Sequence, residues 1–200
     1  MKTIILGGFL GSGKTTVLLQ LAKYITGMEG DPQVVILENE IGEVGVDNQM
    51  LGGSAMAVEN VFNGCICCSG AVDLLEAVRT IKEQYSPDWL LVEATGVALP
   101  SSIHDKLLEA FGIKAAILTI ADASRWLRIK RVSPDFSVSQ VEDADVVLLT
   151  KVDKLDAEKL GPVEEDIKNC SKSAAIYPVC AIKPIDTKYF DELMTFAAEA

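Results

Sequence analysis

Basic residues and histidine are scarce in this chain of 200 residues. It carries 18 lysines and arginines against 29 aspartates and glutamates, a net charge of −11, and it has a single histidine. Nucleic acids and anionic membranes select proteins with basic patches, so this charge argues against both as partners. The length fits one domain with one core of ordinary size.

Long apolar runs are also missing, and no segment resembles a signal peptide. The amino terminus reads MKTIILGGFLGSGKTT, in which a short apolar run leads straight into a glycine-rich turn. A run of that length predicts a buried strand rather than a targeting segment or a membrane helix. We therefore expect a cytoplasmic protein. In that reducing compartment its five cysteines are expected to be thiols or metal ligands rather than disulfides.

What the chain does contain is an alternation of strand-length apolar runs with helical patterns. Most of the runs are apolar throughout, as is typical of parallel strands covered on both faces. The alternation predicts a three-layer α/β domain with a mostly parallel central sheet and helices on both faces. We expect it to fill residues 1–200 as a single domain, and no structure is assigned to residues 122–142. The predicted strands are residues 2–6, 33–37, 57–62, 89–93, 115–121, 146–149 and 176–179, and the predicted helices are residues 14–24, 71–85, 101–111, 157–169 and 186–198.

The first motif with a clear chemistry is GGFLGSGKTT, which contains Gly-x-x-x-x-Gly-Lys-Thr between a predicted strand and a predicted helix. Glycines in such a loop let backbone N–H groups turn inward around phosphate oxygens, and the helix N-terminus adds positive charge. The motif predicts a P-loop NTPase fold. Lys14 should reach the β- and γ-phosphates and Thr15 should bind Mg²⁺. The predicted phosphate-binding residues are Gly8, Gly11, Ser12, Gly13, Lys14, Thr15 and Thr16.

Two later strands end in residues that suit a nucleotide site. In DWLLVEATG, Glu93 ends a buried strand and Gly96 follows it. An acid at this edge of the sheet can hold the Mg²⁺ water shell or orient the attacking water, and Gly96 can offer its N–H to the γ-phosphate. In VVLLTKVDKLD, Lys151 and Asp153 match the Lys-x-Asp part of the Asn-Lys-x-Asp motif that reads guanine in GTPases, with Thr150 in place of Asn. The segment PVCAIKP follows where such proteins place a loop around the base.

In these motifs the sequence resembles the CobW-type members of the CobW/HypB/UreG GTPase family. The resemblance also rests on ENEIGEVGVDNQML, NGCICCS, LLVEATGVALP and ADVVLLTKVDK. It implies GTP hydrolysis to GDP, catalysed by Lys14 and Glu93 and coupled to the binding and delivery of a transition metal, or to assembly of a metal- or corrinoid-dependent enzyme. It implies a client metalloprotein or enzyme-assembly partner. It also implies a metal site formed by Glu38, Glu43, Cys65, Cys67 and Cys68. Many CobW-type proteins carry a further C-terminal domain and a His-rich stretch, and we expect neither here.

Three thiols in four positions suit such a metal site. Cys65, Cys67 and Cys68 precede a predicted helix, whose N-terminus lowers the thiol pKa, and Ser69 is a candidate N-cap. Two or three thiolates completed by a carboxylate or water suit Zn²⁺ or Co²⁺. Burial in the core and redox chemistry are the alternatives. Cys170 and Cys180 are isolated and are expected to be structural.

Two other functions compete with a metal-handling GTPase that is slow alone and is completed by a partner surface or a homodimer. One is a P-loop ATPase or small-molecule kinase, for which the segment SRWLRIKRV supplies arginines. The other is a non-catalytic metal or redox sensor. The lone His104 is expected to be solvated or to cap its helix.

Overall fold

The computed structural model describes residues 1–38, 56–60 and 70–198, and for residues 56–60, 70–73 and 198 it describes the backbone alone. The strands are β1 (Lys2–Gly7), β2 (Val34–Glu38), β3 (Met56–Asn60), β4 (Trp89–Glu93), β5 (Ala116–Asp122), β6 (Val146–Thr150) and β7 (Ala175–Pro178). The helices are α1 (Lys14–Thr26), α2 (Gly70–Gln84), α3 (Pro100–Phe111), α4 (Trp126–Val132), α5 (Pro134–Ser139), α6 (Ala157–Cys170) and α7 (Thr187–Ala198), with a 3-10 turn, η1, at Val152–Lys154.

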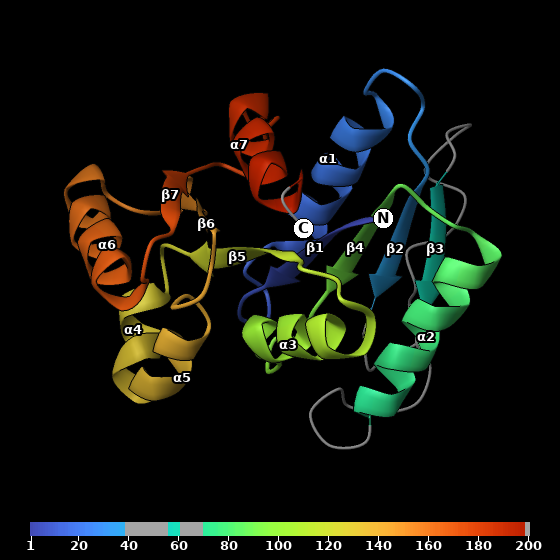
Figure 1. The fold of residues 1–200 in the computed structure, drawn as a ribbon. Coiled ribbons are helices and arrows are strands. Elements are labelled where there is room, and N and C mark those ends of the chain that lie inside the picture. Colours follow the sequence, from blue (N-terminus) through green and yellow to red (C-terminus); the bar gives the residue numbers. More distant parts are fainter. Residues whose placement is uncertain (39–55, 61–69, 199–200) are drawn as a thin grey trace.

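The seven strands form one sheet in the order β3-β2-β4-β1-β5-β6-β7, and every neighbouring pair is parallel (Figure 1). Strands β4 and β5 flank β1, whereas the next strand along the chain, β2, lies two places away. The chain therefore leaves β1 at a point where the strand order reverses. In open α/β sheets, ligands bind at the carboxyl ends of the strands beside such a point.

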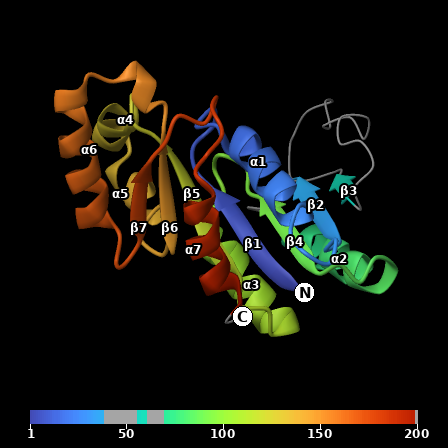
Figure 2. The ribbon, with the colours of Figure 1, turned by 90° about the horizontal axis from the view of Figure 1, so that it is seen from above.

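Helices cover both faces of the sheet, which gives the three layers. Ile4 and Leu6 of β1 pack with the apolar residues of α1 and α7, while Ile5 packs on the opposite face with those of α2 and α3. Figure 1 shows α1 and α7 above the sheet and α2 and α3 below it. Figure 2 shows α4, α5 and α6 together at the end formed by β6 and β7, where Trp126 and Ile167 share a core cluster.

The predicted fold class is confirmed, and the boundaries of most elements agree to within one or two residues. Strand β4 matches its prediction, because all five of its residues are buried and apolar runs of that kind are unambiguous. The unassigned segment 122–142 contains the end of β5 and two short helices, α4 and α5. Among the described residues, no helix is long and apolar enough to cross a membrane.

Candidate nucleotide-binding site

The loop between β1 and α1 has the backbone that a phosphate cradle requires. Gly8, Gly11 and Gly13 have φ angles of 127°, 70° and 101°, which side chains rarely tolerate. A Cβ on Gly8 would also lie 2.1 Å from the carbonyl oxygen of Ile120 in β5. All three predicted glycines are therefore needed for their conformation, and Gly8 is needed for space as well.

Lys14, the first residue of α1, is held against this loop. It is 6 % exposed, and its Nζ donates to the carbonyl oxygens of Gly8 at 3.2 Å and Phe9 at 3.4 Å. The ammonium group thus stays beside the cradle, where it can meet phosphate oxygens. Thr16, also predicted to bind phosphate, lies exposed in the first turn of the same helix.

Thr15 connects the phosphate loop to the acid that ends β4. Its Oγ1 donates to Oε1 of Glu93 at 3.1 Å, and Glu93 is 6 % exposed. Glu38, at the end of β2, is in register with Glu93 and is equally buried. Hydroxyl and carboxylate oxygens are the ligands that Mg²⁺ prefers. The strand order thus places the predicted magnesium residues, Thr15 and Glu93, in contact and puts a second carboxylate on the neighbouring strand.

Two hydroxyl groups beside this site fit a bound phosphate. Among the described residues, the buried Oγ of Ser12 and Oγ1 of Thr95 have no hydrogen-bond partner. Ser12 belongs to the phosphate loop and Thr95 follows Glu93 by two residues. Buried polar atoms are normally paired, so a ligand rich in acceptor oxygens suits these positions.

The predicted γ-phosphate residue Gly96 lies directly against the phosphate loop. A Cβ on Gly96 would be 2.5 Å from the backbone nitrogen of Leu10. The turn that contains Gly96 is closed by a hydrogen bond of 3.0 Å from the Ala98 N–H to the Thr95 carbonyl oxygen. Only a glycine lets this turn and the loop approach so closely.

At the other end of the loop, β6 delivers the predicted base-reading residues. Thr150, which replaces the usual Asn, is 1 % exposed, and its hydroxyl lies 2.6 Å from the Ser12 carbonyl oxygen and 3.2 Å from that of Ala121. Lys151 has a left-handed φ of 57°, and its Nζ donates to the Gly11 carbonyl oxygen. The Thr and Lys side chains thus both fasten the predicted base-reading segment to the phosphate loop.

Asp153 follows in η1 and meets the loop after β7. The Cys180 thiol donates to Oδ1 of Asp153 at 3.3 Å. Loss of hydration and the Asp153 carboxylate raise the pKa of the Cys180 thiol, so it stays a donor at neutral pH. Sequence reasoning treated Cys180 as structural, but its contact places it at the predicted base site, within the PVCAIKP segment.

Sequence reasoning missed a charged group that joins the segment after β6 to the phosphate loop. Asp122 ends β5, and its carboxylate accepts hydrogen bonds from Nε of Arg125 at 2.7 Å and from Nζ of Lys151 at 2.8 Å. Burial alone would raise the pKa of Asp122, but hydrogen bonds from Lys151, Ser124 and Arg125 outweigh it and hold that pKa below its usual value. Arg125 also donates to the Leu10 carbonyl oxygen at 3.1 Å. The available signal was a carboxylate at the end of a strand, at the same edge as Glu93.

Most of the predicted metal site lies outside the described residues. Glu43, Cys65, Cys67 and Cys68 belong to that part, and so does Ser69, the candidate N-cap of α2. Glu38 is described and is in register with Asn60, the last residue of β3. Within the described part of the chain, no three His, Cys, Asp or Glu side chains are grouped to hold a metal ion.

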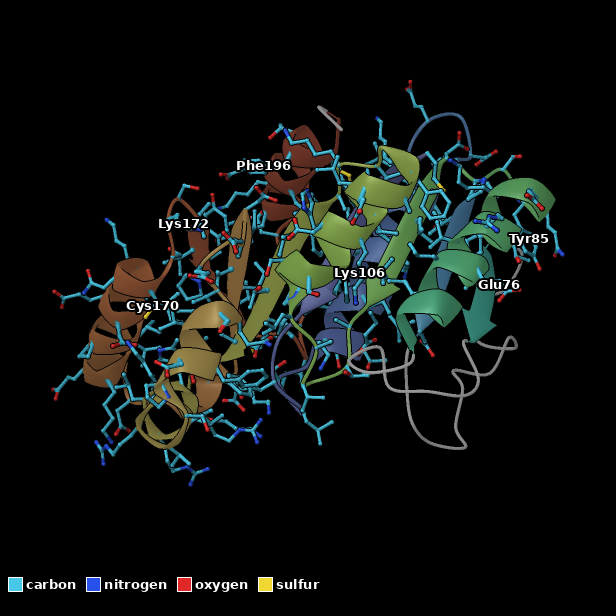
Figure 3. The ribbon with its side chains drawn as sticks, turned by 60° about the horizontal axis from the view of Figure 1, so that its bottom comes forward. Glu76, Tyr85, Lys106, Cys170, Lys172 and Phe196 are labelled. Carbon is cyan, nitrogen blue, oxygen red and sulfur yellow. The ribbon has the colours of Figure 1, made fainter. Side chains whose placement is uncertain are left out.

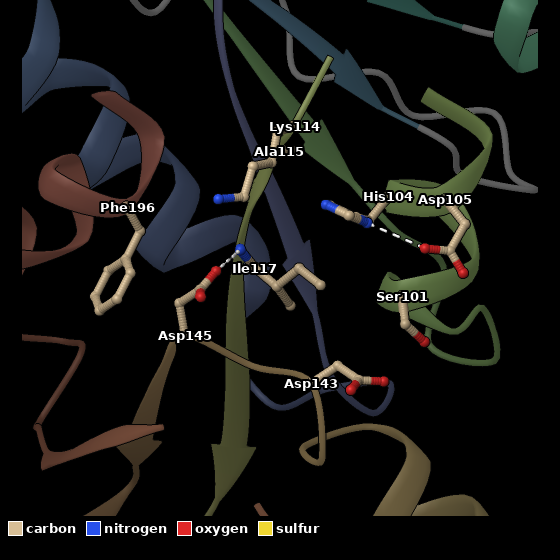
Figure 4. Close-up of a pocket in the computed structure, with 9 residues that line it drawn as sticks. All are labelled: Ser101, His104, Asp105, Lys114, Ala115, Ile117, Asp143, Asp145 and Phe196. Atoms are coloured by element: carbon tan, nitrogen blue, oxygen red, sulfur yellow. Dashed lines mark hydrogen bonds and ion pairs between the residues drawn. The ribbon is translucent and has the colours of Figure 1, made fainter. Parts of the chain in front are cut away.

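The remaining cysteine and the histidine lie away from this edge. Cys170, labelled on α6 in Figure 3, has its sulfur 3.0 Å from Nζ of Lys130 on α4. His104 lines a separate cavity of about 350 Å³ (Figure 4) near the amino ends of β5 and β6. Its Nδ1 lies 3.2 Å from Oδ1 of Asp105. In the same cavity burial raises the pKa of Asp145.

Comparison with known proteins identifies a family that the chain matches. Residues 2–178 match the family described as CobW/HypB/UreG, nucleotide-binding domain. The chain belongs to this family. It is 33% identical over 189 residues to the zinc chaperone YjiA of Escherichia coli, covering 88% of this chain and 56% of YjiA. It is 26% identical over 213 residues to zinc-regulated GTPase metalloprotein activator 1 of Dictyostelium discoideum, covering 86% of this chain and 44% of that protein. The chain thus spans about half the length of these relatives.

A solved structure also shows the same fold. The hydrogenase maturation factor HypB of Archaeoglobus fulgidus has a TM-score of 0.67 at 15% identity, and the match covers 100% of this chain and 90% of that one. At that identity the likeness shows the fold alone. The sequence prediction of the family is confirmed by the family match.

Proposed function

We propose that this chain binds and hydrolyses GTP and couples its nucleotide state to the binding and delivery of a transition metal. The observation that carries the nucleotide half is the contact between Thr15 and Glu93, at 3.1 Å, beneath a complete phosphate loop. Asp153 stands at the same edge of the sheet, with its carboxylate placed by the Cys180 thiol. A carboxylate there accepts the ring N–H and exocyclic amine of guanine, whereas adenine presents the opposite pattern.

Each of these residues has a distinct part in hydrolysis. Lys14 and the loop N–H groups bind the phosphates, and Thr15 and Glu93 would hold Mg²⁺, which neutralises the charge that develops on the phosphate oxygens. The water oxygen bonds to the γ-phosphorus as the bond to the β–γ bridging oxygen breaks, giving GDP and phosphate. Gly96 would offer its N–H to the γ-phosphate. A partner protein or a second copy of the chain would supply what a slow GTPase lacks.

The metal half of the proposal rests on Cys65, Cys67 and Cys68 with Glu38 and Glu43. Thiolates with carboxylates suit Zn²⁺ or Co²⁺, and two relatives are a zinc chaperone and a zinc-regulated metalloprotein activator by name. Glu38 is in register with Glu93, so the metal and magnesium sites would adjoin. The recipient would be a client metalloprotein or an enzyme under assembly, in the cytoplasm.

The arrangement of the arginines weakens the kinase alternative. Arg125 donates hydrogen bonds to the Asp122 carboxylate and to the Leu10 carbonyl oxygen, while Arg128 and Arg131 are exposed on α4. A substrate lid would need arginines that face the transferred phosphate. Among the described residues these side chains do not form one.

The nucleotide half is tested by phosphate release from GTP and ATP with Mg²⁺. Wild type should release phosphate from GTP and show little activity with ATP. Glu93→Gln should lower the GTP rate by at least about tenfold, because it weakens a magnesium ligand. Glu83→Gln, on the exposed face of α2, is the matched control and should behave as wild type. Equal rates with the two nucleotides would overturn the guanine assignment.

A further inference from the structure

A buried glutamine joins the two loops that meet the γ-phosphate site. Gln140 follows α5 and is 2 % exposed. Its Oε1 accepts the N–H of Gly8, the first residue of the phosphate loop, at 3.1 Å. Its Nε2 donates to the carbonyl oxygen of Ala98 at 2.9 Å. One side chain therefore spans the phosphate loop and the turn that contains Gly96.

The backbone of Gln140 is itself fixed to the sheet. The Thr119 hydroxyl, from the middle of β5, donates to the Gln140 carbonyl oxygen at 2.7 Å. Phe136, one turn earlier in α5, also packs edge-on against Phe9 of the phosphate loop, with ring centroids 5.4 Å apart. The Gln140 backbone is thus anchored to β5, so its side-chain amide can set the distance between the two loops.

The chemistry of this position admits glutamine and few other residues. Gly8 N–H can only donate and the Ala98 carbonyl can only accept, so the bridging group needs one acceptor and one donor. A carboxylate supplies the acceptor alone, and an apolar side chain supplies neither. Because the groups are buried, a missing partner is not replaced by water at no cost.

We propose that Gln140 is a positioning residue for the γ-phosphate. It holds the Thr95–Ala98 turn at a fixed distance from the phosphate loop, so that Gly96 and the loop meet the same phosphate group. This inference rests on the proposed function and adds a residue to its mechanism. The Gly8 bond orients the loop for any bound nucleotide, whereas the Ala98 bond affects the binding only of a nucleotide that has a γ-phosphate.

The two bonds can be separated with two variants, by titrating GDP and a non-hydrolysable GTP analogue and measuring GTP turnover. Gln140→Glu keeps the acceptor for Gly8 and loses the donor for Ala98. It should bind GDP within about twofold of wild type, while analogue affinity and kcat each fall about tenfold. Gln140→Met keeps the volume and loses both bonds, so GDP affinity should fall by about tenfold as well.

A matched control exists at the base side of the site. Gln20 of α1 bridges in the same way, accepting Ile185 N–H at 2.9 Å and donating to the Ala181 carbonyl oxygen at 2.7 Å. It holds the loop after β7, whose Cys180 contacts Asp153 at the proposed base site. Gln20→Glu should therefore change the affinities for GDP and the analogue by equal factors and leave their ratio unchanged.

The outcomes divide cleanly. If Gln140→Glu lowers GDP and analogue affinity equally, or changes neither affinity nor kcat, the positioning role is wrong while a GTP-binding wild type keeps the proposed function. If wild type binds neither nucleotide, both fail. Should the Gln140 variants not fold, as judged by thermal melting, Thr119→Val withdraws the hydroxyl that fixes Gln140 and should lower the same analogue-to-GDP ratio to a smaller extent. An unchanged ratio in Thr119→Val would count against the proposal.

Discussion

The two ends of the proposed nucleotide site are held together by different physical means. At the base end, charged side chains act beside the neutral Thr150 and Gln20, since Lys151 and Arg125 converge on Asp122 and also bind carbonyls of the phosphate loop. At the phosphate end, the loops are held by close backbone packing at Gly8 and Gly96 and by hydrogen bonds of the buried Gln140 amide. Disruption of the phosphate end should therefore depend on volume and on buried neutral hydrogen bonds, and disruption of the base end on charge and pH as well.

The largest effect is expected from Gly96→Ala at the phosphate end. Its Cβ would lie 2.5 Å from a backbone nitrogen, so the turn or the loop must shift, and we expect the free energy of unfolding to fall by about 3 kcal/mol. Gly112→Ala is the control, because its φ of 67° is unfavourable but nothing lies within 4 Å. It should cost about 1 kcal/mol and leave nucleotide affinity intact. Denaturant titration and GDP binding measure both, and equal losses in the two variants would contradict the steric account.

At the base end, Asp153→Asn should exchange the base that is read. The variant replaces an acceptor with a donor, so GTP affinity should fall about 100-fold, roughly 3 kcal/mol for two charged hydrogen bonds. Xanthine carries a carbonyl where guanine carries its amine, so affinity for XTP should rise. Competition binding measures both, with Asp156→Asn on the exposed surface as control. Loss of GTP binding with no gain for XTP would mean that Asp153 does not read the base.

A smaller effect with a defined pH dependence is expected from Asp122→Asn. The pKa of Asp122 is lowered in the folded protein from its ordinary value of 3.8. The carboxylate therefore stabilises the fold fully at pH values above 3.8, and this stabilisation is lost as the pH falls through the folded pKa. The cations are partly exposed, so the variant should lose about 1–2 kcal/mol at pH 7. The difference from wild type should shrink in acid. A difference that is constant with pH would rule out the charge as its cause.

The sequence predicted the parts of the site that depend on local pattern. The loop from Gly8 to Thr15 and the strand that ends in Glu93 were both recognised, because a buried strand leading into a glycine-rich turn is a local signal. The register that brings Glu38 beside Glu93 was not predicted, because it depends on β2 lying next to β4 rather than next to β1.

The segment from Asp122 to Gln140 could not be predicted for a different reason. Helix α4 has seven residues and only Trp126 is buried, so no helical stripe of apolar residues is present to recognise. Pro134 at the start of α5 was a usable signal for a helix N-terminus. The roles of Arg125 and Gln140 depend on backbone groups of a loop more than 100 residues away, which no local pattern encodes.

The most direct test of the coupling between nucleotide and metal is a Co²⁺ titration in reducing buffer, followed by visible absorption. It is run with Mg²⁺ alone, with a non-hydrolysable GTP analogue and with its ATP counterpart. We predict thiolate-to-cobalt bands that tighten about tenfold with the GTP analogue only, vanish in Cys67→Ala and persist in Cys170→Ala. Cobalt affinity that is the same with and without the analogue would contradict the coupling of the two sites.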